Sequence, residues 1–205
     1  ATALGSVGST TTLVTLFTGF LIGMGGGVNV RVAQHLGARQ TRQVQDAVHT
    51  ALLLCALAGL AITVLCLLLA GPMLRLLHTK DDLIDGAVLY FRIYALGMPA
   101  LGIFNFGNAV LSANGDTRRP LAYLTAAGVL NILLNLFFVI VCRMAADGVA
   151  LASIISQYLS AALVLGHMLR MQDACRVELR KLRFHREETG RLLALGIPAG
   201  VQNMI

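Results

Sequence analysis

The chain has 205 residues, of which 57% are hydrophobic and 13% are charged, and its mean hydropathy is +0.76. A soluble domain has about 25% charged residues, so this composition excludes an ordinary soluble protein. The formal net charge of +6 does not indicate nucleic-acid binding, because the basic residues gather in the loops between long apolar runs. Apolar runs longer than about 18 residues instead predict an all-α, multi-pass membrane protein.

The sequence predicts a series of membrane spans. Complete spans are expected at about residues 8–33, 47–74, 83–113, 121–142 and 148–169, and a further one begins near residue 192. The chain starts with Ala and stops inside an apolar run, so we expect a piece of a longer protein. Three parts are expected, namely spans within 1–169, a basic cytoplasmic linker at 170–191 that lies partly on the membrane surface, and a truncated helix at 192–205.

The first two spans carry small and polar residues at informative positions. Gly19, Gly23 and Gly27 lie four residues apart and therefore on one face of a helix. This ridge of small residues favours close contact with another helix. His49 lies near the start of the second span, where it is either an interfacial or backbone-bonded histidine or a proton relay.

The third span is interrupted near its middle by Gly97-Met98-Pro99. A proline inside a helix removes one backbone hydrogen bond and kinks the chain, so Gly97 and Pro99 form either a hinge or a static kink. Asn105, Asn108 and Ser112 follow at helical spacing and form a polar stripe. We include both asparagines among the candidate cation- or substrate-binding residues.

Residues 113–120 form a tight polar turn between the third and fourth spans, with Asn114-Gly115 ending the incoming helix and Pro120 in the first turn of the next. The fourth span holds Asn131 and Asn135, which lie four residues apart and so point the same way. Two amides on one face of a membrane helix serve either as interhelical hydrogen bonds or as a ligand or cation site.

The fifth span has a polar stripe of Ser153, Gln157 and Ser160. These side chains either pack and hydrogen-bond to their own helix backbone or face a polar cavity. In this span Ser153 and Gln157 are candidate binding residues.

No catalytic or metal-binding pattern accompanies these stripes in the sequence. The four cysteines, Cys55, Cys66, Cys142 and Cys175, have no metal-like spacing and are expected to be small packing residues. No paired carboxylates, Ser-Lys pair or Cys-His pair lie within reach of each other by helix spacing. We therefore do not expect an enzyme, a cofactor or a metal site, apart from the cation site that the amide pair allows.

Charge in the loops predicts the orientation of the spans. The loops at residues 34–45, 114–119 and 170–191, together with Arg31, hold 12 of the 16 lysines and arginines. Because cytoplasmic loops are enriched in these residues, these three loops are expected in the cytoplasm. Arg92 lies within a span, where it either snorkels to the nearer interface or forms an ion pair.

Four local patterns, in order and at matching spacing, resemble those of the multidrug and toxic compound extrusion (MATE) transporters. They are Val32-Ala33-Gln34 with Gly37-Ala38, Gly115-Asp116-Thr117-Arg118 with Pro120, Asn131-Ile-Leu-Leu-Asn135, and Gly148-Val-Ala-Leu-Ala-Ser153-Ile-Ile-Ser-Gln157. The resemblance covers nearly the whole chain. It implies that the complete spans are helices two to six of a twelve-helix protein with two six-helix bundles facing a central cavity.

The resemblance also implies a function. Members of the family export organic cations and drugs by alternating access, driven by inward flow of H⁺ or Na⁺. It therefore implies a multi-pass antiporter, monomeric in the bacterial inner membrane, with a cationic or amphipathic small-molecule substrate. The alternative is a flippase for lipid-linked oligosaccharides from the same wider superfamily, which would favour a cavity rich in basic residues.

Individual site residues follow from the resemblance at matching positions. The family's cation site uses an Asn and an Asp four residues apart, which match Asn131 and Asn135 here. A nearby Thr of the family matches Ser153, and a Tyr matches Tyr90. Asn135 stands where the family has the acid, and an amide coordinates Na⁺ weakly through its oxygen but does not take up a proton.

Overall fold

The computed structural model describes residues 2–76, 78 and 80–205, with side chains described from residue 10 onward. Every regular element within these residues is helical. In chain order they are α1 (Thr2–Gly37), α2 (Thr41–Leu76), α3 (Asp81–Ala95), α4 (Met98–Ala113), α5 (Arg118–Leu136), the π-helical turn η1 (Phe137–Val141), α6 (Ala146–Arg170), the 3₁₀ turn η2 (Leu179–Lys181) and α7 (Arg186–Met204).

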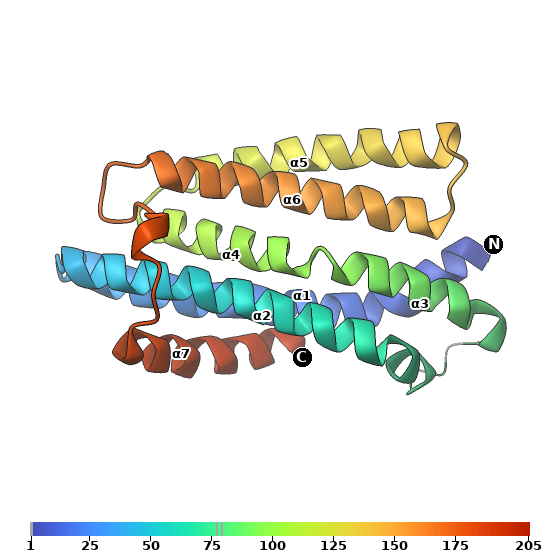
Figure 1. Ribbon diagram of the computed structural model, residues 1–205, viewed down its shortest axis with the longest axis horizontal. Helices are drawn as coiled ribbons and strands as arrows, with labels where there is room; N and C mark the ends of the chain where they lie inside the picture. Colours follow the sequence, from blue (N-terminus) through green and yellow to red (C-terminus); the bar gives the residue numbers. More distant parts are fainter. Residues whose placement is uncertain (1, 77, 79) are drawn as a thin grey trace.

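The long helices lie side by side in one elongated bundle (Figure 1). Helix α4 packs against α1, α2 and α6, while α5 contacts mainly α6 at one edge and α7 packs on α1 at the other. In the described ranges, four helices are long and apolar enough to cross a membrane, or five when the bent pair α3 and α4 counts as one span. The expected all-α, multi-pass architecture is confirmed.

The third expected span is two helices that meet at an angle of 42°. The break falls at Leu96 and Gly97, so that Pro99 lies in the first turn of α4, where its missing N–H leaves no helical bond unmade. The carbonyl of Ala95 cannot receive a bond from Pro99 and instead accepts one from the Thr63 hydroxyl of α2, at 2.7 Å. Helix α2 therefore stabilises the break.

The turn between α4 and α5 has the expected form. Gly115 has a φ of +88°, a conformation that suits glycine. Asp116 accepts a hydrogen bond from the backbone N–H of Arg119 at 3.2 Å and caps the start of α5. Asn114 also donates to Asp173 of the segment after α6 at 2.9 Å, so this turn contacts the linker.

The linker after α6 folds back onto the bundle. Cys175 and Val177 are buried in an apolar cluster that includes Val48 of α2 and Met168 of α6. Burial, reinforced by the Asp173 carboxylate, raises the pKa of the Cys175 thiol to about 12, so it stays protonated at neutral pH. Sequence analysis missed this inward packing, because the apolar residues of the linker have no clean period.

Helices α1 and α7 run antiparallel along a seam of glycines. A Cβ atom added at Gly27 would lie 2.7 Å from the Cα of Gly196, and one added at Gly23 would meet the backbone of Ala199 and Gly200. The expected ridge of small residues on α1 is therefore a helix contact, and its partner is α7. At Gly23 and Gly27 the two backbones lie close together, while the Phe20 side chain packs against Gly200.

A cluster of ion-paired side chains lies at the end of this seam, where α7 begins. Glu188 accepts two hydrogen bonds from the Arg31 guanidinium, at 2.9 and 3.0 Å, and His35 Nε2 lies 2.9 Å from its Oε1 atom. All three side chains are buried. Helix α7 begins at Arg186, six residues before the expected start, because this pairing brings its first turn into the fold.

Candidate functional site

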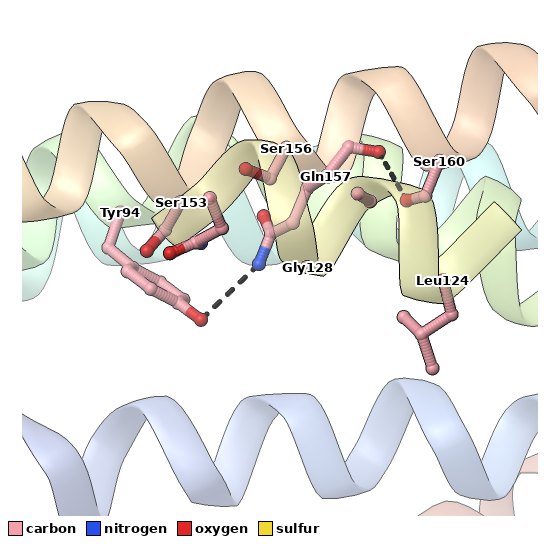
Figure 2. Close-up of a pocket in the computed structure, with 9 residues that line it drawn as sticks. Tyr94, Leu124, Gly128, Ser153, Ser156, Gln157 and Ser160 are labelled. Atoms are coloured by element: carbon pink, nitrogen blue, oxygen red, sulfur yellow. Dashed lines mark hydrogen bonds between the residues drawn. The ribbon is translucent and has the colours of Figure 1, made fainter. Parts of the chain in front are cut away.

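A hollow of about 390 Å³ lies between α3, α5 and α6 (Figure 2). It combines amide, hydroxyl and phenol groups with a larger apolar surface, and none of its lining residues is charged. Its lining consists of Tyr94, Leu124, Ala127, Gly128, Asn131, Ser153, Ser156, Gln157 and Ser160. Such a lining suits an amphipathic organic molecule better than a polyanion.

Helix α6 supplies most of the polar wall. Ser153, Ser156, Gln157 and Ser160 lie on one face because their spacing follows the helical repeat. The serine hydroxyls donate to carbonyls of their own helix, those of Val149, Ala152 and Gln157, at 2.8 to 3.1 Å. The predicted back-bonding is confirmed, and it leaves the serine oxygens as hydrogen-bond acceptors toward the hollow.

The break between α3 and α4 positions one wall of the hollow. Gln157 donates from Nε2 to the Tyr94 hydroxyl at 3.3 Å. A Cβ atom at position 97 would collide with Gln157 Oε1, so Gly97 leaves the space that this amide fills. The candidate hinge thus contacts a candidate binding residue directly.

The two asparagines of α5 bond to each other. Asn135 donates from Nδ2 to Asn131 Oδ1 at 2.7 Å, and Asn131 lines the hollow. The Oδ1 atom of Asn135 is buried with no hydrogen-bond partner in the described part of the chain. The bond lies within one helix, so these amides do not join two helices here, and an amide oxygen is left that could accept a cation.

The remaining predicted residues lie elsewhere. Tyr90 does not line the hollow but is buried against Ala146 and Ala150 of α6, with its ring 5.9 Å from that of Tyr94. Asn105 and Asn108 line a second, smaller hollow of about 160 Å³ between α1 and α4, together with Asn29. The structure therefore divides the predicted residues between the two hollows and leaves Tyr90 outside both.

Tyr94 and Asn29 were missed by sequence analysis. Tyr94 follows Tyr90 by four residues and shares its helix face, so spacing alone could not choose between them. Asn29 donates to the carbonyl of Ala109 at 2.9 Å, and no second asparagine or glutamine one helical turn away marked it in the sequence. Only the packing of the helices shows that Tyr94 and Asn29 line these hollows.

His49 is backbone-bonded. Its Nε2 atom accepts the N–H of Glu178 at 3.0 Å, so the proton is on Nδ1, which lies 2.6 Å from the carbonyl oxygen of Gln45. The ring is buried and joins α2 to the linker. This arrangement matches the first of the two predicted roles for His49.

Comparisons with known proteins agree with this architecture. The MatE family model matches residues 1–137. The chain is 29% identical over 205 residues to "Probable multidrug resistance protein YpnP" of Bacillus subtilis, covering 100% of this chain and 46% of that protein. It is 25% identical over 211 residues to "FAD transporter" of Shewanella oneidensis, covering 99% and 46%. The chain thus spans about half the length of the curated relatives it matches.

Solved structures match the fold over nearly the whole chain. A multidrug resistance MATE family transporter of the MOP superfamily in an inward-facing conformation has a TM-score of 0.91 at 22% identity, covering 99% of this chain and 46% of that one. The outward-facing conformation of such a transporter has a TM-score of 0.90 at 22% identity, covering 98% and 45%. Since the family model also matches well over half of the sequence, the chain belongs to the MATE family of membrane transporters.

Proposed function

We propose that the full-length protein is a secondary active exporter of cationic or amphipathic small molecules. The observation that carries this proposal is the uncharged polar hollow formed by Asn131, Ser153, Gln157 and Tyr94 at the middle of the helices. Export proceeds by alternating access as a drug:H⁺ or drug:Na⁺ antiport. The protein acts as a monomer in the bacterial inner membrane and uses no cofactor besides the coupling ion.

The amide pair on α5 favours Na⁺ over H⁺ at this position. Neither Asn131 nor Asn135 takes up a proton near neutral pH, whereas the unpartnered Oδ1 atom of Asn135 is a hard oxygen ligand. Proton coupling would need a carboxylate outside this hollow.

The substrate class is proposed from the lining of the hollow. The names of the relatives include both a multidrug resistance protein and an FAD transporter, so similarity leaves the choice between a drug and an anionic metabolite open. The lining of the hollow contains no basic side chain that would pair with phosphates. The flippase alternative, which favours basic residues, is disfavoured for the same reason.

Efflux from proteoliposomes tests the proposal. The full-length protein is reconstituted, a cationic fluorescent dye is loaded, and a Na⁺ or an H⁺ gradient is imposed separately. We expect efflux driven by one gradient and abolished when that gradient is dissipated. If circular dichroism shows that the protein is folded but neither gradient drives efflux, the proposed antiport is refuted.

The Asn135→Asp variant should make transport pH-dependent. The substitution replaces the Nδ2 group, which donates to Asn131, by a second oxygen and so creates a titratable carboxyl group beside the unpartnered oxygen. Its ionised form strengthens the attraction for a cation by a charge-assisted contact. We expect dye efflux at saturating Na⁺ to fall by about tenfold below the pKa of the new group and to recover above it, while wild-type efflux changes little.

The control for this experiment is Asn135→Ser, which removes the amide without adding an acid. A pH profile that shifts equally in both variants would attribute the effect to loss of the amide. Equal, flat profiles in all three proteins would mean that position 135 does not contribute to coupling.

A further inference from the structure

A further cavity, of about 320 Å³, lies at the end of the bundle where α2 begins and the linker folds back. Four cationic side chains surround it, and only one carboxylate does. The cations are Arg42, Arg180, Lys181 and Arg183, and the carboxylate is Asp46, which lies 3.4 Å from His185. We call this cavity the basic pocket. It lies on the cytoplasmic side in the orientation that the loop charges predict, and it is separate from the hollow between α3, α5 and α6.

The arginines of the basic pocket have no ionic partner in the part of the chain that the structure describes. Lys181 forms an exposed pair with Glu178 at 3.4 Å, but no ion pair involves Arg42, Arg180 or Arg183. Like charges that converge without counter-charges repel one another, and an anion relieves this repulsion. Arginine also presents a planar fork of donors that matches the oxygens of a phosphate group.

Buried side chains of α2 hold the loop that carries these cations. The His49 ring accepts the N–H of Glu178 at 3.0 Å, just before η2. On the far side of η2, the Thr50 hydroxyl accepts the N–H of His185 at 3.2 Å and donates to the carbonyl of Arg183 at 3.4 Å. His49 and Thr50 are both buried, so the loop is fixed at its two ends before any ligand arrives. A fixed frame lowers the entropy lost on binding.

The surroundings of the basic pocket indicate where the anion comes from. Leu179 and Phe184 flank the cations in sequence and expose 60% and 49% of their surface. Exposed apolar side chains between arginines are typical of a segment that lies in the membrane interface, where anionic headgroups concentrate. We propose that the basic pocket binds the phosphate group of an anionic lipid headgroup in the cytoplasmic leaflet. The bound lipid would hold the linker against α2.

The test uses the full-length protein in detergent and follows binding of phosphatidylglycerol by native mass spectrometry, with phosphatidylcholine as the neutral comparison. We expect the Arg180→Gln/Arg183→Gln variant to bind phosphatidylglycerol about tenfold or more weakly, because it loses charge-assisted hydrogen bonds to the phosphate. Binding of phosphatidylcholine should be unchanged. The single Arg42→Gln variant, altered on α2 rather than in the loop, tests the same pocket if the double variant does not fold.

The matched control is Arg39→Gln/Arg176→Gln, which also removes two exposed arginines near this end of the bundle but none that line the basic pocket. We expect it to change phosphatidylglycerol binding by less than about twofold. An equal loss in both double variants would overturn the proposal in favour of diffuse surface charge. A different result would show that the anion is free phosphate and not a lipid. In that case millimolar inorganic phosphate displaces the lipid, and phosphate alone stabilises the protein against heat as much as the lipid does.

Discussion

Replacing Glu188 by Ala should destabilise the packing of α7 on α1 by about 3 kcal/mol, because it leaves the buried Arg31 guanidinium without its counter-charge. We take the lower end of the usual range, since the cluster lies near the ends of both helices. Thermal unfolding of the full-length protein measures the effect as a lower midpoint.

Glu187→Ala is the matched control for this prediction. Glu187 is the preceding residue, with a side chain that is 73% exposed, and it pairs with Arg191 within the same helix. Exposed pairs of this kind contribute little to stability, so the midpoint should hardly move. Equal shifts for the two variants would contradict the structural role of the Arg31–Glu188 pair.

The same pair predicts a pH dependence. Burial by itself would raise the pKa of Glu188, but hydrogen bonds from Arg31 and His35 and their charges lower it below its ordinary value of 4.5. The carboxylate therefore contributes stability that is fully present above pH 4.5 and is lost as the pH falls toward the lowered pKa. The difference in unfolding midpoint between wild type and Glu188→Ala should shrink over this acidic range.

Gly27→Ala and Gly26→Ala should change stability in opposite directions. The new methyl group at residue 27 would lie 2.7 Å from backbone atoms of Gly196, which forces α1 and α7 apart and costs about 1–3 kcal/mol. The methyl group at residue 26 meets nothing within 4 Å, and alanine stabilises a helix relative to glycine by about 0.5–1 kcal/mol. Thermal unfolding of the two variants should show a fall and a small rise.

A higher unfolding midpoint for both variants would mean that α1 and α7 move apart at the seam without strain. In that case the close approach of α1 and α7 would not be required for stability. A fall for both would indicate that the exposed position of Gly26 is covered in the full-length protein.

Features that depend on neighbours within one helix could be predicted from the sequence. The shared face of Asn131 and Asn135, the serine stripe of α6 and the glycine ridge of α1 all follow from the helical repeat. The turn at Gly115 also depends on local chemistry alone. Of these features, Asn131 and the serine stripe of α6 lie in the polar wall of the candidate site.

Features that depend on contacts between distant segments could not be predicted. Arg31 and Glu188 are 157 positions apart, and nothing local to either one identifies the other. Tyr94 rather than Tyr90 lines the hollow, and its partner is Gln157 of another helix. His49 and Thr50 hold the linker in place through hydrogen bonds to its backbone. Backbone groups are the same at every residue, so the sequence does not mark these partners.

The Gln157 side chain lies both beside the break between α3 and α4 and in the wall of the cavity. Because the Gln157 amide fills the space beside Gly97, any side chain at position 97 would have to displace that amide. The same amide donates to Tyr94, so its displacement alters the wall that a guest molecule would contact. The choice of glycine at the break therefore determines the wall of the cavity through this one side chain.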